Sequence, residues 1–214
     1  MKIIVIGAGA MGCLYGAYLS RHNDVTMLDV YEPQVESINQ NGITVLEEDG
    51  TEQHFSDVRA MKSGTCSEVA DLVIVFVKST HTESSLEENK DLFGENTLVM
   101  TLQNGAGNDR KIAKYVKTEN IIIGTSKHNS VNLGGGKIRH SGNGVTTIGS
   151  NLEENPHLQT VADLLTEAGF QSAISDDIQR IIWSKLFVNL SINTFTAITE
   201  TPIAYMIENQ YAWD

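Results

Sequence analysis

The segment that most constrains the fold is an apolar run, Ile3 to Ile6, followed at once by Gly7-Ala8-Gly9-Ala10-Met11-Gly12. An apolar run that breaks into glycines and continues as a helical pattern predicts a buried strand, a tight turn and a helix. In such a turn Gly7 allows the sharp bend, Gly9 leaves room for a phosphate, and Gly12 lets the helix pack closely on the strand. The free N–H groups and the positive end of the helix dipole then face an anion. The pattern therefore predicts a binding site for the pyrophosphate of a dinucleotide.

A second strand is predicted from Val25 to Asp29, so it ends in a carboxylate. Asp29 stands about 20 residues after Gly7, the separation expected for an acid that hydrogen-bonds the 2′-hydroxyl of a ribose. A glycine turn of this kind also occurs in α/β proteins that bind no nucleotide. The agreement of strand, spacing and acid favours the dinucleotide site.

Composition indicates the class of protein and excludes some partners. The chain has 214 residues, a formal net charge of −12 and no cluster of basic residues, so we expect no binding to nucleic acid. Its two cysteines, Cys13 and Cys66, match neither a disulfide nor a metal-ligand pattern, and no metal is expected. We also expect no signal peptide and no membrane segment, because no apolar run approaches the ~20 residues that a membrane span needs. These features predict a cytoplasmic protein.

Strand and helix patterns alternate along most of the chain, which predicts an α/β fold of the Rossmann type with a doubly wound, mostly parallel sheet. Continuous apolar runs predict central strands at Leu72–Val77, Thr97–Leu102 and Ile121–Ile123. Helices are predicted at Glu32–Gln40 and Pro156–Gly169, a hairpin at Ile43–Leu46 and Gln53–Phe55, and a short strand at Phe170–Ile174. The glycine-rich stretch from Ser130 to Gly149 predicts antiparallel additions joined by turns.

A long helix is predicted from Asp177 to about Thr199, and we place a domain boundary near Ser175. Residues 1–175 then form a dinucleotide-binding domain. Residues 176–214 form the start of an all-helical domain.

The ends of the predicted central strands carry residues suited to a ligand site. Lys78, Asn104 and the segment after Gly124 each follow one of these strands. Open α/β sheets bind ligands beyond the carboxyl ends of their strands. We therefore expect these three positions to lie on the same edge of the sheet as the glycine turn.

Three polar residues, Lys185, Asn189 and Asn193, recur at intervals of four along the predicted long helix and so lie on one side of it. The rest of that segment is mostly apolar. A polar stripe on such a helix faces either solvent or a polar site. Asparagine is a mediocre helix former, so two in register favour amide chemistry at a site.

Several segments are typical of one enzyme family when they occur in this order. They are the glycine motif of residues 7–12, Val77-Lys78, Gln103-Asn104-Gly105, Gly124-Thr125 with His128, Gly142-Asn143-Gly144, and Trp183-Ser184-Lys185-Leu186-Phe187-Val188-Asn189-Leu190-Ser191-Ile192-Asn193. Together they resemble the ketopantoate reductases (2-dehydropantoate 2-reductases), and the resemblance covers the whole chain. The glycine motif is shared by many dehydrogenases, whereas the helix with its lysine and two asparagines is much more specific.

The resemblance implies that a nicotinamide cofactor, by family default NADP(H), reduces a 2-oxo acid (ketopantoate) to a D-2-hydroxy acid on the route to pantothenate and coenzyme A. It implies that Lys185 is the general acid that protonates the developing alkoxide, and that Asn189 and Asn193 bind the hydroxyl and carboxylate end of the substrate. Lys78 and Asn104 would lie beside nicotinamide and substrate, with Asn104 helping to position them. A lysine acts best as this acid when partial burial and a neighbouring cation, such as Lys78, lower its pKa.

The segment Leu28-Asp29-Val30-Tyr31-Glu32 departs from the family, which usually has a basic residue here to bind the 2′-phosphate of NADPH. A carboxylate repels a phosphate but accepts a hydrogen bond from a 2′-hydroxyl. We therefore expect NAD(H) to be preferred, and family members that use NAD tend to be D-2-hydroxyacid dehydrogenases. His128 is a second acid–base candidate, although a surface or hydrogen-bonding role is the simpler expectation.

The resemblance also implies a helical domain longer than residues 176–214, with a serine and a glutamate at the substrate site that these residues do not supply. The long helix would then expose an apolar side, which we expect to form an interface, for example in a homodimer through residues 177–214. We expect weak turnover by this chain with retained dinucleotide binding. Three hypotheses are open: a ketopantoate reductase, an NAD-dependent D-2-hydroxyacid dehydrogenase, and a dinucleotide-binding module without catalysis.

Overall fold

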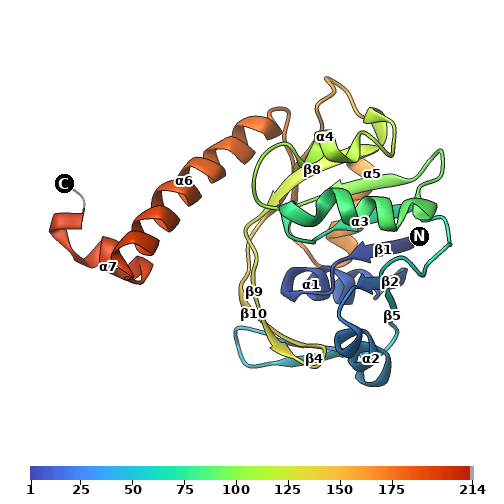
Figure 1. Ribbon diagram of the computed structural model, residues 1–214, viewed down its shortest axis with the longest axis horizontal. Coiled ribbons are helices and arrows are strands. Elements are labelled where there is room, and N and C mark those ends of the chain that lie inside the picture. The colour runs from blue at the N-terminus through green and yellow to red at the C-terminus, as the bar shows by residue number, and fades with distance from the viewer. Residues whose placement is uncertain (213–214) are drawn as a thin grey trace.

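The computed structural model describes residues 1–212, which form a large and a small β-sheet with helices around them (Figure 1). In spatial order the strands of the large sheet are β12 (Ser172–Ile174), β11 (Thr146–Gly149), β8 (Ile121–Ser126), β7 (Leu98–Thr101), β6 (Leu72–Val75), β1 (Lys2–Ile6), β2 (Asp24–Asp29) and β5 (Arg59–Lys62). Every neighbouring pair from β8 to β5 is parallel, whereas β11 runs antiparallel to β8 and parallel to β12. The predicted fold class, a doubly wound and mostly parallel sheet with antiparallel additions, is confirmed.

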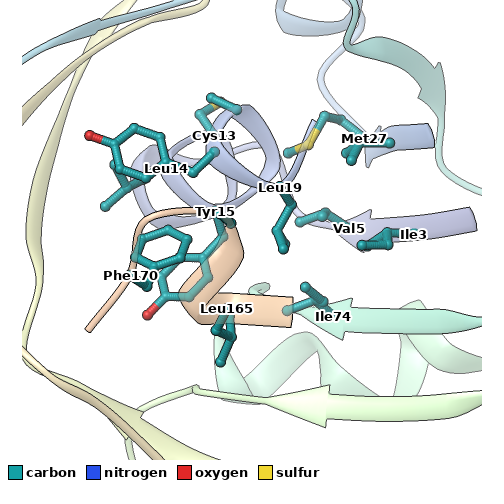
Figure 2. Packing of buried hydrophobic residues seen from close by; sticks show 14 of the residues in the cluster. Ile3, Val5, Cys13, Leu14, Tyr15, Leu19, Met27, Ile74, Leu165 and Phe170 are labelled. Atoms are coloured by element: carbon teal, nitrogen blue, oxygen red, sulfur yellow. The ribbon is translucent and has the colours of Figure 1, made fainter. Parts of the chain in front are cut away.

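Helices cover both faces of this sheet. They are α1 (Ala10–Leu19), α2 (Glu32–Asn41), α3 (Thr82–Glu88), α4 (Asn108–Ile112), α5 (Leu158–Glu167) and the start of α6 (Ile178–Thr199), whereas α7 (Ile203–Glu208) follows α6 away from the sheet. Alternate residues of β1 point into two separate cores: Val5 belongs to the core beneath α1, α2 and α5, and Ile4 to the core beneath α3, α4 and the start of α6. In the first core the rings of Tyr15 and Phe170 stack, with their centroids 4.2 Å apart (Figure 2). Burial on both faces explains the continuous apolar runs of the central strands.

The strand ends differ from the prediction in one respect that matters for the site. β8 does not end at Ile123 but continues through Gly124 and Thr125 to Ser126. A Cβ atom at Gly124 would lie 2.4 Å from the carbonyl oxygen of Thr147 in β11, so this glycine permits close strand pairing rather than a turn. The edge of the sheet is therefore reached at Ser126. The short elements β5, α3 and α4 were also missed, because a few residues carry too little periodicity.

The small sheet has the order β4 (Glu52–Phe55), β3 (Ile43–Leu46), β10 (Lys137–Gly142) and β9 (Asn129–Gly134). The predicted hairpin of β3 and β4 is confirmed by their antiparallel pairing. The glycine-rich stretch after Ser130 also forms antiparallel pairs, but it divides between the sheets: β9 and β10 join the small sheet, and β11 joins the large one. β10 pairs in parallel with β3, which brings distant segments of the chain together.

α6 begins where the sequence predicts, because the side chain of Asp177 accepts a hydrogen bond from the backbone N–H of Arg180 at 3.1 Å. Figure 1 shows α6 leaving the sheets and α7 lying beyond its far end. Within α6 only Ile178 and Ile182 are buried. Four apolar side chains of this helix are more than half exposed: Phe187, Val188, Leu190 and Ile198.

α6 is also long and apolar enough to cross a membrane, judged by length and composition alone. Our expectation that no apolar run reaches this length is therefore wrong. A single helix of this kind is weak evidence for a membrane segment. In addition, α6 carries Lys185 and Asn189, and such polar groups are costly in hydrocarbon.

Candidate active site

The glycine turn between β1 and α1 has the geometry that its sequence predicts. Gly7 has φ +104° and donates from its backbone N–H to the carbonyl of Leu28 at 2.7 Å. A Cβ atom at Gly12 would lie 1.9 Å from the carbonyl oxygen of Gly7, so only glycine allows this contact of helix and turn. A Cβ atom at Gly9, by contrast, would meet no atom within 4 Å. The space beside Gly9, at the N-terminus of α1, is therefore open to an anion.

The carboxylate of Asp29 is held against this turn. Its Oδ2 accepts a hydrogen bond from the backbone N–H of Ala8 at 2.7 Å, and its Oδ1 accepts one from Tyr31 at 2.9 Å. The carbonyl of Ala8 in turn accepts from the side chain of Gln34 at 3.0 Å. Each carboxylate oxygen still has a second lone pair, so Asp29 can accept a further hydrogen bond from a ribose hydroxyl.

A cavity of about 350 Å³ extends from the glycine turn past Asp29 to Ser63 and Glu88. Lys62 lies beside Asp29 in the register of β2 and β5, but its ammonium pairs with the carboxylate of Glu32 at 2.6 Å. Asp29 therefore lines this cavity with a carboxylate, whereas the charge of the nearby Lys62 is balanced by Glu32.

A second cavity, of about 650 Å³, brings four of the predicted site residues together. It is lined by Met11 from the glycine motif, Lys78 after β6, Asn104 after β7, and Lys185 from α6. Lys78 lines both cavities, so the two are neighbours along the carboxyl edge of the sheet. Asn189 is half-buried and Asn193 is exposed, and neither lines this cavity.

Gln103 fixes the loops that carry two of these residues. Its side-chain amide donates to the carbonyl of Val77 and to the hydroxyl of Thr82, while its carbonyl oxygen accepts from Thr101 at 2.9 Å. These bonds tie the end of β7 to the end of β6. They hold the Asn104 loop beside Lys78, a role that the sequence motif does not reveal.

Lys185 is half-buried and hydrogen-bonded. Its Nζ donates to the carbonyl oxygen of Ser126 at 2.7 Å. Burial lowers the pKa of Lys185, and the charge of Lys127 lowers it further. The lowered pKa agrees with the expectation for a general acid, but the neighbouring cation is Lys127 rather than Lys78. Ser126 and Lys127 were missed because the predicted strand ended too early.

His128 is buried rather than on the surface. Its Nδ1 lies 3.0 Å from Nε2 of His140 in β10, and Nδ1 of His140 lies 2.9 Å from the carboxylate of Glu47. Burial lowers the pKa of His128 to about 4, and the neighbouring His140 contributes. His128 also lines the cavity that contains Lys185. The hydrogen-bonding role is thus confirmed, with partners that the sequence alone does not identify.

Among residues 1–212, no group of three or more His, Cys, Asp or Glu side chains could hold a metal ion. The glycine turn, the acid at the end of β2 and the cavities along the carboxyl edge define a Rossmann-type protein of the dehydrogenase class. Residues 3–153 match the family described as ketopantoate reductase PanE/ApbA. The chain belongs to this family.

Relatives and solved structures agree with this assignment. The chain is 31% identical to a 2-dehydropantoate 2-reductase from Halobacterium salinarum over 97% of its own length and 69% of the relative's. A structure of D-mandelate dehydrogenase with NADH and anilino(oxo)acetate has a TM-score of 0.92 at 28% identity, over 99% of this chain and 69% of that one. The 2-dehydropantoate 2-reductase of Geobacter metallireducens has a TM-score of 0.91 at 29% identity, over 99% of this chain and 70% of that one.

Proposed function

We propose that this protein reduces a 2-oxo acid to a D-2-hydroxy acid with a nicotinamide dinucleotide, and that ketopantoate is its substrate. The observation that carries the proposal is the shared cavity, which brings Lys185 and Asn104 next to Met11 of the glycine motif. The family name extends the proposal to the formation of pantoate for pantothenate and coenzyme A in the cytoplasm.

The residues present fit a dinucleotide. The backbone from Gly7 to Gly12 would hold the pyrophosphate, since the space beside Gly9 is open. Asp29 would accept from a ribose hydroxyl, and Lys78 and Asn104 would lie beside the nicotinamide. When bound, the reduced cofactor supplies a hydride to the substrate carbonyl.

Lys185 would protonate the substrate oxygen, on which negative charge develops as the ketone is reduced. The carbonyl of Ser126 orients its ammonium, and the lowered pKa makes the ammonium a better proton donor. Asn104 would position substrate and cofactor from the end of β7. We assign Asn189 and Asn193 to the hydroxyl and carboxylate end of the substrate, on the strength of their place in the family's motif.

We further propose that NAD(H) is preferred over NADP(H). The Asp29 carboxylate at the glycine turn and the pairing of Lys62 with Glu32 support this. The solved D-mandelate dehydrogenase contains NADH and has the same fold as this chain. That relationship favours a second candidate function, an NAD-dependent D-2-hydroxyacid dehydrogenase with a broader range of substrates.

The domain division is part of the proposal. Residues 1–175 would form the dinucleotide-binding domain and residues 176–214 would belong to a helical substrate domain, since the contacts of α6 with the sheet lie in its first half. A homodimer through residues 177–214 is supported by the exposed apolar side chains of α6. Light scattering coupled to size exclusion tests it, and a monomer at high concentration would contradict it.

A panel of 2-oxo acids that includes ketopantoate and phenylglyoxylate, each assayed with NADH and with NADPH, tests the proposed function. We expect oxidation of NADH with ketopantoate as the best substrate. Faster reduction of phenylglyoxylate would favour the second candidate. Cofactor binding without reduction of any 2-oxo acid would favour the third hypothesis, a module without catalysis.

A further inference from the structure

A chain of buried hydrogen bonds leads from the small sheet to the cavity that contains Lys185. The carboxylate of Glu47 bonds Nδ1 of His140 at 2.9 Å, and Nε2 of His140 bonds Nδ1 of His128 at 3.0 Å. His140 is 4% exposed and His128 is 8% exposed. We call Glu47, His140 and His128 the relay.

The donors and acceptors of the relay follow from its carboxylate end. A carboxylate only accepts, so Nδ1 of His140 carries a proton. In the neutral imidazole Nε2 of His140 is then an acceptor, and Nδ1 of His128 donates to it. This leaves Nε2 of His128 with a free lone pair. Burial lowers the pKa of His128 and so disfavours its charged form.

Nε2 of His128 has no partner in the described part of the chain. The same is true of the hydroxyl of Ser130, and both residues line the cavity that contains Lys185. Polar atoms buried without a hydrogen bond are rare in folded proteins and call for an explanation. An acceptor that is fixed by a relay and buried at a ligand cavity is suited to a donor brought by the ligand.

We propose that the relay fixes His128 in one neutral tautomer, with Nε2 as an acceptor that takes a hydrogen bond from an N–H or O–H group of the bound ligand. His128 is then a positioning residue for the proposed reaction, and this inference rests on the proposed function. The donor comes from the carboxamide of the nicotinamide or from the hydroxyl of the 2-hydroxy acid. His128 also lies close to the Lys185 contact, because its backbone N–H donates to the hydroxyl of Ser126 at 3.1 Å and the carbonyl of Ser126 accepts from Lys185.

The neighbours of Glu47 determine how the amide of Glu47→Gln would be oriented. Arg21 donates to the side-chain oxygen of Gln53 at 2.6 Å, so the amide nitrogen of Gln53 faces Glu47 and donates to its Oε1 at 2.8 Å. The hydroxyl of Tyr18 donates to the same oxygen. In Glu47→Gln the amide oxygen must therefore take this position, and the amide N–H₂ must face His140.

An amide N–H₂ can only donate, so it would push the proton of His140 from Nδ1 to Nε2. His140 would then donate to Nδ1 of His128, and Nε2 of His128 would become a donor. Glu47→Gln thus reverses the polarity of the proposed ligand contact with almost no change of shape. Glu48→Gln is the matched control, because Glu48 is the exposed neighbour in sequence.

The test uses ¹⁵N NMR of the imidazole nitrogens in the full chain, which separates protonated from unprotonated nitrogen. We expect Nε2 of His128 to be unprotonated in the wild type and in Glu48→Gln, and protonated in Glu47→Gln. A protonated Nε2 in the wild type, or identical spectra of the two variants, would overturn the proposal. If Glu47→Gln does not fold, the wild-type spectrum still decides.

Ligand titrations identify the donor. A change at Nε2 of His128 with NADH alone assigns the donor to the carboxamide, and a change only with NAD⁺ plus D-pantoate assigns it to the hydroxyl. We then expect Glu47→Gln to weaken binding of that ligand at least about tenfold. If neither ligand changes the signal of Nε2 of His128 in the wild type, the proposal is overturned. The tautomer is observed without turnover, so failure of the relay and failure of the proposed reduction are distinguishable.

Discussion

The ammonium group of Lys185 lies 2.7 Å from the carbonyl oxygen of Ser126, to which it donates a hydrogen bond. This bond joins the first half of α6 to the end of β8 and keeps Lys185 at the cavity beside the glycine motif. The other two members of the polar stripe, Asn189 and Asn193, lie farther along the helix. The position of the proposed acid is therefore defined by the dinucleotide-binding part of the chain.

Replacing Lys127 with Met should raise the pKa of Lys185, because it removes the nearby positive charge that lowers it. The proposed acid must be protonated to act, so activity falls as pH rises through its pKa. We expect the alkaline limb of the pH–rate profile to move to higher pH in Lys127→Met. Lys117→Met serves as the control, since Lys117 pairs with Glu95 at the surface. An unmoved alkaline limb would contradict this role of Lys127.

Asp29→Asn should weaken the preference for NADH. The substitution removes the negative charge that repels a 2′-phosphate. It also weakens the acceptor for a ribose hydroxyl, since a hydrogen bond to a charged group contributes about 1.5–3 kcal/mol. Fluorescence titration of both cofactors measures it, with Asp24→Asn at the exposed start of the same strand as the control. We expect the wild type to bind NADH at least about tenfold more tightly than NADPH. Tighter binding of NADPH by the wild type would rule out the proposed preference for NAD(H).

Two alanine substitutions separate the cofactor role of the glycine turn from its structural role. Gly9→Ala places a methyl group in open space, so we expect the free energy of unfolding to change by less than about 0.5 kcal/mol. The same methyl group should obstruct the pyrophosphate and weaken NADH binding about tenfold or more. Gly12→Ala forces a Cβ against the carbonyl of Gly7 and should destabilise the fold by about 2 kcal/mol or more. Urea unfolding and NADH titration of both variants check this, and unchanged NADH binding by Gly9→Ala would argue against the site.

The fold should lose stability in mild acid because of His128. Its pKa is about 4 in the folded chain, below the ordinary value of 6.5. Its contribution to stability is therefore complete above pH 6.5 and is lost as pH falls through 4. Urea unfolding measures the free energy of unfolding at pH 7.5 and at pH 5. Its decrease between the two pH values should be smaller in His128→Gln than in the wild type or in the exposed control His22→Gln. Equal losses in all three proteins would show that another group is responsible.

Local patterns predicted the parts of the site that depend on short segments. Gly7, Gly12 and Asp29 could be assigned because the geometry of a tight turn restricts which residues fit, and Lys78 and Asn104 because strand ends meet at one edge of a sheet. Contacts between distant segments carry no such signal. Glu47 and His140 are 93 residues apart, and they meet only because β10 pairs with β3. In the same way, Gly124 has the composition of a turn but lies within a strand, because β11 packs closely against it.

The most direct test of the account is the rate of NADH oxidation with ketopantoate, measured at high protein concentration for the wild type and for Lys185→Ala. Lys185 is proposed as the proton donor, so we expect the substitution to lower the rate about 100-fold or more. NADH affinity should stay within about threefold, because the glycine turn and Asp29 are unchanged. A rate in the wild type no higher than in Lys185→Ala would contradict the proposed function.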